Sequence, residues 1–275
     1  MSPDPRPSVG PVPRTALITG ASSGIGAAFA GVFAAGGFDV VLVARREDRL
    51  AALAAELERR HGRRAHVLVA DLSRPDAPAH VCAALEARGL RIDALVNNAG
   101  YGVPGAFVDA PWEAHRAMLQ VMVTGVAELT HRLLPGMLGR GYGRVVNVAS
   151  LAGLVPAPAG HTLYAASKAL VIKFSEALAH EVRARGVHVT AVCPGFTRSE
   201  FHDVTGTREK VDRLPGWLWM EADVVARQGF EAVMAGTPIL VNGRVNRAIA
   251  TFVRHLPLGV VTWAGRWLGR SYRKT

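Results

Sequence analysis

The chain has 275 residues, of which 49% are hydrophobic and 20% are charged. This composition is typical of a globular protein with a large core and excludes a disordered or low-complexity chain. Lys and Arg number 32 against 22 Asp and Glu, and no acidic residue follows Glu231, so the net charge of +10 lies largely near the C-terminus. That distribution indicates an anionic surface or ligand met by the tail, and no nucleic-acid partner is expected.

Cysteine usage and the termini narrow the class further. Cys82 and Cys193 stand far apart with no CxxC pair, and the 10 histidines form no HExxH motif, so neither a disulfide framework nor a metal site is predicted. Residues 1–13 are proline-rich without an apolar run, which predicts a disordered lead-in and no secretory signal. No apolar run reaches the roughly 18 residues of a spanning helix, and a cytoplasmic location is expected.

Short β-branched runs alternate with helical patterns from Thr15 onward. Strands are predicted at Thr15–Thr19, Asp39–Ala44, Ala65–Ala70, Ile92–Asn97, Arg144–Val148, Val187–Cys193 and Pro238–Val241. Helices are predicted, among others, at Gly24–Ala35, Glu47–Arg60, Pro111–Leu138, Leu163–Ala184 and Ala222–Ala235. The alternation predicts an α/β fold: a single doubly wound Rossmann domain over residues 14–243, with a seven-stranded parallel sheet and helices on both faces. Residues 244–275 are interpreted as a basic, amphipathic extension.

A glycine-rich turn, Gly20-Ala21-Ser22-Ser23-Gly24-Ile25-Gly26, follows the first predicted strand and opens a helix. In this context glycines permit a sharp turn and let backbone N–H groups approach a pyrophosphate at the positive end of the helix. The same residues satisfy GxSxG, the nucleophile elbow of serine hydrolases, with Ser22 as nucleophile. That alternative places the elbow on the first strand and leaves Gly26 without a role, so a dinucleotide site is favoured.

The end of the second predicted strand selects between cofactors. An NAD site needs a carboxylate there for the ribose 2′-OH, but the sequence reads Ala44-Arg45-Arg46, and Asp39 lies at the opposite end of the strand. Two guanidiniums suit a 2′-phosphate, which favours NADP(H). The alternative is that Arg45 and Arg46 merely open a solvated helix.

From Thr15 to about Val241 the chain resembles the short-chain dehydrogenase/reductase family, of the type with TGxxxGxG and YxxxK motifs. The landmarks follow in order: Thr19 to Gly26, Asp71-Leu72, Asn97-Asn98-Ala99-Gly100, Ser150, Tyr164 to Lys168 and Pro194-Gly195. The resemblance implies that Asp71 and Leu72 border the adenine, that Asn98 stabilises the central sheet, and that Pro194, Gly195 and Thr197 contact the nicotinamide side. The expected cofactor-binding residues are therefore Gly20, Ser22, Ser23, Gly24, Ile25, Gly26, Arg45, Arg46, Asp71, Leu72, Asn98, Ala99, Gly100, Tyr164, Lys168, Pro194, Gly195 and Thr197.

Ser150, Tyr164 and Lys168 are the predicted catalytic residues. Tyr164 and Lys168 are spaced i, i+4 and share one helix face. An ammonium beside the phenol is expected to lower the tyrosine pKa toward the working range of a general acid/base, while the Ser150 hydroxyl bonds a substrate carbonyl. By resemblance, the trio serves an NADP(H)-dependent oxidoreductase that transfers a hydride between the nicotinamide and a carbonyl or alcohol carbon, with Lys168 also holding the nicotinamide ribose.

One position departs from the family pattern. The family places an Asn in an N-x-x-G setting where this chain has Met122-Val123-Thr124-Gly125. A methionine cannot hydrogen-bond the water that the Asn positions for the lysine's proton relay. Two hypotheses follow: a working reductase with an altered relay, which we favour, and a catalytically impaired nucleotide-binding or membrane-associated protein.

Residues in the C-terminal third of the chain bear on the substrate and on possible partners. Trp217, Trp219 and Met220 fall where the family covers its substrate, so they predict either core packing or an apolar lid for a lipophilic ketone or alcohol. The branch acting on long-chain acyl or mycolate-type ketones looks similar here. Val260 to Arg270 forms an amphipathic pattern with Trp opposite Arg, which predicts peripheral membrane contact or packing on protein. The resemblance also implies a homodimer or homotetramer.

Overall fold

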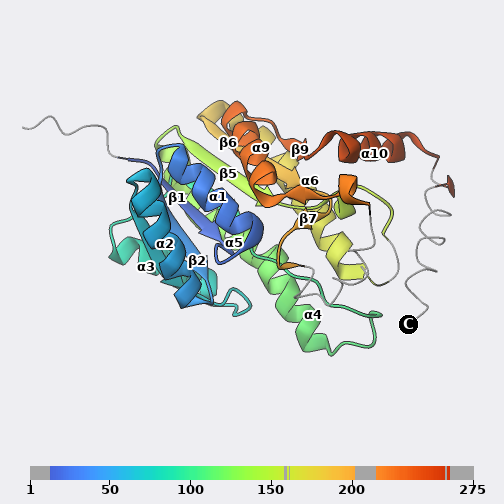
Figure 1. The fold of residues 1–275 in the computed structure, drawn as a ribbon, viewed down its shortest axis with the longest axis horizontal. Coiled ribbons are helices and arrows are strands. Elements are labelled where there is room, and N and C mark those ends of the chain that lie inside the picture. The colour runs from blue at the N-terminus through green and yellow to red at the C-terminus, as the bar shows by residue number, and fades with distance from the viewer. Residues whose placement is uncertain (1–12, 158–159, 161, 202–214, 258, 261–275) are drawn as a thin grey trace, which may run out of the picture.

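Seven parallel strands form the central sheet of the computed structural model, in the order β3-β2-β1-β4-β5-β6-β9 (Figure 1). Their bounds are β1 Thr15–Thr19, β2 Asp39–Ala44, β3 Ala65–Val69, β4 Ala94–Asn97, β5 Gly143–Val148, β6 Val187–Cys193 and β9 Ile239–Val241. The structure describes residues 13–157, 160, 162–201, 215–257 and 259–260. The predicted seven-stranded, doubly wound sheet is confirmed, with strand ends that shift slightly.

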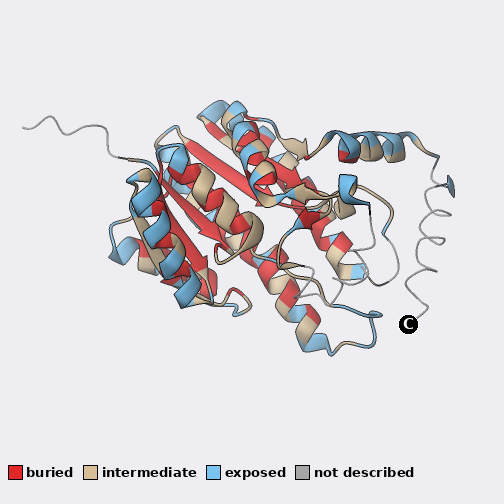
Figure 2. Ribbon diagram, viewed as in Figure 1, coloured by how far each residue is buried: buried red, intermediate tan, exposed pale blue. Residues whose placement is uncertain are grey.

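Helices cover both faces of the sheet. They are α1 Gly24–Ala35, α2 Glu47–His61, α3 Ala77–Ala87, α4 Trp112–Leu119, α5 Gly125–Gly139, α6 Thr162–Val182, α9 Ala222–Ala235 and α10 Arg244–His255. Residues from α1, α2 and α9 join one buried cluster, and residues from α3, α4, α5 and α6 join another. Buried strands therefore separate two helical layers, as Figure 2 shows by colour.

Because side chains alternate along a strand, the strands contribute apolar residues to the buried clusters on both faces of the sheet. In β1, Ala16 and Ile18 belong to the cluster that contains Phe29 of α1, whereas Leu17 belongs to the opposite cluster. All three β1 side chains are fully buried. Burial on both faces explains why the strands read as continuous apolar runs in the sequence.

The strand order reverses between β1 and β4, which are hydrogen-bonded neighbours. From β1 the chain builds outward through β2 to β3, then crosses back to β4 and builds the other half. In open parallel sheets, ligands bind outside the carboxyl ends of the strands at such a reversal. The topology therefore locates the candidate site at the ends of β1 and β4.

The single helix predicted over Pro111–Leu138 is wrong in its middle. A π-helical turn, η1 Gln120–Thr124, separates α4 from α5. The Gly125 N–H bonds the Gln120 carbonyl, five residues earlier. A Cβ on Gly125 would lie 2.9 Å from that oxygen, so glycine permits the wider turn. Such single π turns often mark functional sites.

Several short turns and strands lie between the main elements of the fold. A 3-10 turn, η2 Leu151–Gly153, follows β5, and another, η3 Arg183–Arg185, precedes β6. Strands β7 Thr197–Arg198 and β8 Met220–Glu221 pair in parallel, with the 3-10 turn η4 Gly216–Leu218 just before β8. No helix among the described residues is long and apolar enough to span a membrane. Most of the predicted lead-in, residues 1–12, and most of the predicted Val260 to Arg270 helix, residues 261–270, lie outside the described residues.

Candidate active site

The carboxyl edge of the sheet gathers the residues predicted from the sequence. Gly20 to Gly26 follow β1, Arg45 and Arg46 follow β2, Asp71 and Leu72 follow β3, Asn98 to Gly100 follow β4, Ser150 follows β5, and Pro194, Gly195 and Thr197 follow β6. Tyr164 and Lys168 project from α6. Because parallel strands end at one edge, segments far apart in sequence meet there.

The glycine turn has the geometry of a phosphate-binding turn. Gly20 and Gly24 take positive φ angles of +66° and +56°, and a Cβ on Gly26 would lie 2.2 Å from the Gly20 carbonyl oxygen. No larger residue fits Gly26. Ser23, which precedes α1, does not cap the helix with its side chain, and the first turn of α1 carries no acidic residue. The N-terminal N–H groups and positive dipole of α1 thus fit an anion.

Asn98 braces this turn against the end of β4. Its side-chain amide donates to the carbonyl oxygens of Thr19 at 2.9 Å and Gly20 at 3.3 Å. The Thr19 hydroxyl in turn accepts from the backbone N–H groups of Asn98 and Ala99, and donates to the Val96 carbonyl. These bonds fix the turn between the two strands at the reversal point, while Ile25 packs beneath it against the core.

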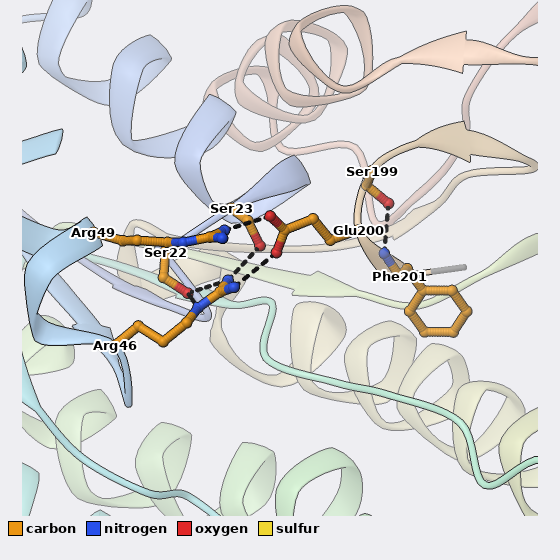
Figure 3. A network of polar contacts seen from close by, with 7 residues as sticks. All are labelled: Ser22, Ser23, Arg46, Arg49, Ser199, Glu200 and Phe201. Carbon is orange, nitrogen blue, oxygen red and sulfur yellow. Dashed lines mark hydrogen bonds and ion pairs between the residues drawn. The ribbon is translucent and has the colours of Figure 1, made fainter. Parts of the chain in front are cut away.

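Arg46 lies against the two serines of the turn (Figure 3). Its guanidinium donates to the Ser22 hydroxyl from two nitrogens, at 3.2 and 2.9 Å, and to the Ser23 hydroxyl at 3.0 Å. It also forms an ion pair with Glu200 at 2.9 Å. Arg49 of α2 binds the other oxygen of the same carboxylate.

Arg45, in contrast, is exposed, and no carboxylate of the described part of the chain forms an ion pair with it. It nevertheless acts on Asp71 at long range. Burial raises the pKa of Asp71, but hydrogen bonds from Ser73 and the charges of Arg45 and Arg74 outweigh it, so the pKa lies below its usual value. Leu72 beside Asp71 is buried. Among the described residues, Arg45 therefore offers a cation without a carboxylate partner at the end of β2.

Ser150, Tyr164 and Lys168 meet at the ends of β5 and α6. The Ser150 hydroxyl accepts from the Ala152 N–H at 3.1 Å and is hydrogen-bonded to the phenol oxygen of Tyr164. The Lys168 ammonium donates to the carbonyl of Val148, the last residue of β5, at 2.8 Å, and lies 5.8 Å from the centre of the Tyr164 ring. The predicted trio is therefore a contiguous cluster.

The expected effect of Lys168 on the Tyr164 pKa is not found in this structure. Burial raises the pKa of Tyr164, and the Ser150 hydrogen bond lowers it by less. Burial also lowers the pKa of Lys168 to about 8, an effect that a charged Cys193 would oppose. The side-chain nitrogen of Lys168 points at a carbonyl oxygen, and the charged form of the lysine is costly at this buried position. Desolvation therefore decides both pKa values in this state.

Met122 closes the space beside the lysine. It lies in η1 and is fully buried. A Cβ on Gly100 would lie 3.5 Å from the Met122 Cγ and 3.7 Å from the Lys168 ammonium, so these three residues converge. The predicted departure from the family pattern thus places an apolar side chain next to the buried ammonium.

The segment after β6 is tied to the rest of the site. The Pro194 carbonyl accepts from the Leu151 N–H at 2.9 Å, which joins this segment to the Ser150 turn. A Cβ on Gly195 would lie 2.6 Å from the side chain of Asn246, a buried residue of α10. Thr197 is buried and donates to the Gly195 carbonyl at 3.2 Å. The first turn of α10 therefore packs directly on the site.

Both apolar and polar side chains line a small cavity beside Tyr164, and the polar ones are His115 and Thr162. This cavity of about 10 Å³ is lined by Tyr164 together with Val103, Met118 and Leu163, among others. Phe107 and Val108 of the nearby loop are exposed, as is Trp112, the first residue of α4. Of the predicted lid residues, Trp217 is exposed, whereas Trp219 packs against Phe196 with ring centres 5.7 Å apart.

Sequence reasoning missed four contributors to the site: Arg49, Glu200, Asn246 and the Val148 carbonyl. Arg49 and Glu200 carry no local motif, because their contact joins residues 151 positions apart. The α10 helix was detectable, since Val245, Ile249, Phe252 and Leu256 recur at helical spacing opposite Arg244, Arg247 and Arg254.

Known proteins share both the motifs and the fold. The family model for short chain dehydrogenase matches residues 14–210. Nodulation protein G from a Rhizobium species is 41% identical over 200 residues, covering 72% of this chain and 78% of that protein. The very-long-chain 3-oxoacyl-CoA reductase of Anas platyrhynchos is 37% identical over 195 residues, 69% of this chain but only 62% of that enzyme.

A solved structure extends the similarity beyond the matched sequence segment. The short-chain dehydrogenase from Sphingobium yanoikuyae in complex with NADPH aligns with a TM-score of 0.77 and 34% identity, covering 89% of this chain and 96% of that one. Fold, motif order and sequence thus agree. The chain belongs to the short chain dehydrogenase family of nicotinamide-dependent oxidoreductases.

Proposed function

We propose that the chain is an NADP(H)-dependent reductase or dehydrogenase that acts on a carbonyl or alcohol carbon of a lipophilic substrate. The observation that carries this proposal is the cluster of Ser150, Tyr164 and Lys168 at the same sheet edge as the glycine turn. A proton-transfer group and a phosphate-binding turn on one edge are what hydride transfer with an accompanying proton requires.

The residues present fit a phosphorylated dinucleotide. The uncapped N-terminus of α1 suits the pyrophosphate, and the exposed guanidinium of Arg45 suits a 2′-phosphate. The NADPH-bound relative supports the same choice. When bound, the nicotinamide supplies or accepts the hydride.

The chain's own residues handle the proton. Tyr164 is neutral at pH 7, because its pKa lies above the ordinary tyrosine value, which is itself well above 7, so its hydroxyl can donate to the substrate oxygen in the reductive direction. Ser150, already hydrogen-bonded to that hydroxyl, can orient the same oxygen. The ammonium of Lys168 lies 5.8 Å from the centre of the Tyr164 ring, so with cofactor and substrate bound its charge would favour the tyrosinate left behind, and its pKa of about 8 makes that charge pH-dependent.

A lipophilic substrate is supported by the side chains near Tyr164. Val103, Met118 and Leu163 line a cavity together with the tyrosine, and Phe107, Val108 and Trp112 are exposed just before and at the start of α4. Exposed apolar groups of this size often mark a ligand or interaction surface. The similarity to a very-long-chain 3-oxoacyl-CoA reductase agrees with this class.

Steady-state oxidation of NADPH across a panel of ketones that includes long-chain 3-oxoacyl compounds tests the proposal. We expect turnover that rises with the apolar character of the ketone. Nucleotide binding without turnover on any ketone would instead support the catalytically impaired protein suggested by Met122. The serine hydrolase alternative lacks support, because the Ser22 hydroxyl is bonded to a guanidinium that cannot act as a base.

A second candidate function, peripheral membrane contact, is favoured by α10. This helix extends away from the edge strand β9 (Figure 1). Its side chains form an apolar stripe with Phe252 67% exposed and Val245 39% exposed, while Arg244, Arg247 and Arg254 lie on the opposite side of the helix. An exposed apolar stripe opposite arginines fits the surface of an anionic bilayer.

Co-sedimentation of the full chain with vesicles tests this second proposal. We expect binding to phosphatidylserine-containing vesicles, weaker binding to phosphatidylcholine alone, and a loss of binding for Phe252→Ser. Val108→Ser is the matched control, because Val108 is 84% exposed but lies in the loop before α4. Equal loss in both variants, or no binding by the parent chain, would contradict a membrane role for α10.

A further inference from the structure

Glu200 occupies a cradle of donors beside the glycine turn (Figure 3). One carboxylate oxygen accepts from Arg46 at 2.9 Å, and the other accepts from Arg49. Ser23 adds a side-chain hydrogen bond to the same carboxylate. Two guanidiniums and a hydroxyl at the start of α1 thus surround a single internal anion.

The chain itself holds Glu200 in this place. A Cβ on Gly24 would lie 2.8 Å from the Ser199 Cβ, so the backbone before Glu200 packs directly on the glycine turn. Thr197 and Arg198, just upstream, pair with Met220 and Glu221 in the small β7–β8 sheet. The carboxylate therefore reaches the arginines from an anchored segment.

The cradle has the chemistry of a phosphate subsite. Guanidiniums, a hydroxyl and a helix N-terminus are the donors that proteins use for phosphate, and a carboxylate can accept from all of them. Hydrogen bonds from Arg49, Arg46 and Ser23 hold the pKa of Glu200 below its usual value, so the group is charged at neutral pH. A phosphate that binds Arg46 must therefore displace the Glu200 carboxylate from this guanidinium.

The two arginines at the end of β2 are consequently not equivalent. Arg45 has no ion pair with a carboxylate in the described ranges, whereas Arg46 is bonded to Ser22, Ser23 and Glu200. A 2′-phosphate can bind Arg45 without displacing a carboxylate of the described residues. To bind Arg46, it must compete with the carboxylate of Glu200.

We propose that Glu200 is a specificity-determining residue that competes with the cofactor's 2′-phosphate for Arg46 and so weakens the preference for NADPH over NADH. This inference rests on the proposed use of a nicotinamide cofactor. Both ion pairs of Glu200 are partly exposed to water, so the competition is moderate.

Fluorescence titration of the full chain with NADPH and NADH tests the proposal. For Glu200→Gln we expect the Kd for NADPH to fall about three- to tenfold, while the Kd for NADH stays within about twofold. Glu221→Gln is the matched control, because Glu221 forms an exposed ion pair with Arg198 at 3.1 Å in the adjoining sheet, and within the described ranges no ion pair joins it to Arg46 or Arg49. It should leave both Kd values unchanged.

A second variant pair ties the effect to Arg46. In an Arg46→Met background, Glu200→Gln should no longer tighten NADPH binding, because the contested guanidinium is gone. An unchanged or higher Kd for NADPH in Glu200→Gln, or an equal fall for NADH, would overturn the inference. A parent chain that binds neither nucleotide would instead overturn the proposed function, so the two failures are distinguishable.

Discussion

The nucleotide side and the catalytic side of the site are built from opposite kinds of contact. On the nucleotide side, the side chains of Arg46, Arg49 and Glu200 are 41%, 44% and 38% exposed and are joined by ion pairs, and Arg46 is also hydrogen-bonded to serine hydroxyls. On the catalytic side, Lys168 is 6% exposed, and its ammonium is held by one backbone carbonyl with Met122 nearby.

Because of this difference, we expect small, graded effects from changes on the nucleotide side and large effects from changes on the catalytic side. Water screens the exposed ion pairs, so each contributes at most about 1 kcal/mol and can tune cofactor preference in small steps. Burial of Lys168 lowers its pKa to about 8, and desolvation raises the pKa of the half-buried Tyr164, so the proposed proton transfer depends directly on how much water reaches these two groups. Changes on the catalytic side should therefore produce the larger losses.

The largest effect is expected for Tyr164→Phe, which removes the proposed proton donor. We expect kcat to fall about 10² to 10⁴-fold, while the Kd for NADPH changes little. Tyr142→Phe is the control, because the Tyr142 hydroxyl is buried without a hydrogen-bond partner among the described residues and lies before β5, at the opposite edge. Equal losses in both variants, measured by NADPH oxidation, would sink the assignment.

The second effect is a pH-dependent stability that originates at Lys168. Its pKa falls from 10.5 to about 8 on folding, so between these values the unfolded chain binds more protons than the folded chain. The free energy of unfolding should therefore rise with pH across this window, by about 3 to 4 kcal/mol in all. Below pH 8 the cost of the buried ammonium is fully present.

Comparison with Lys168→Met isolates this contribution from other titrating groups. The stability of the parent chain relative to the variant should increase from about pH 8 to 10.5, as followed by denaturant unfolding without cofactor. A difference that stays constant across that range would show that Lys168 is not desolvated, and would remove the contrast between the two sides.

The fold and most of the site could be predicted because their signals are local. Apolar strand runs reflect burial on both faces, and the glycines reflect positive φ at Gly20 and Gly24 and the close approach at Gly26. Motif order then predicted Ser150, Tyr164 and Lys168, which the structure brings together. Each of these signals can be read within a few residues.

The remainder depends on contacts between distant segments. Arg46 meets Glu200 across 154 positions, and no local pattern distinguishes it from Arg45. The π turn at Gln120–Thr124 interrupts a helix whose apolar spacing looks continuous. The tyrosine pKa was predicted from its neighbour alone, but the structure shows that burial decides its direction.

A third prediction sharpens the contrast from the nucleotide side. Arg45→Ala removes the guanidinium that has no carboxylate partner in the described chain, so the Kd for NADPH should rise about tenfold or more through lost charge-assisted hydrogen bonds. The Kd for NADH should remain unchanged. Arg59→Ala, which removes an exposed cation from the last turn of α2, is the control. Equal weakening of NADPH binding by both variants would show that Arg45 contributes only a general positive charge and no specific contact with the 2′-phosphate.

The smallest effect is expected for Met122→Asn. An amide beside Lys168 should offset part of the desolvation and raise the lysine pKa from about 8, so the alkaline limb of the pH–rate profile should move upward. One neutral hydrogen bond contributes about 1 kcal/mol, which limits the shift to roughly one pH unit. Met122→Leu keeps the volume and apolar character and should leave the profile in place. If both variants match the parent profile while Tyr164→Phe abolishes turnover, Met122 has no part in the proton path and Lys168 acts through charge alone.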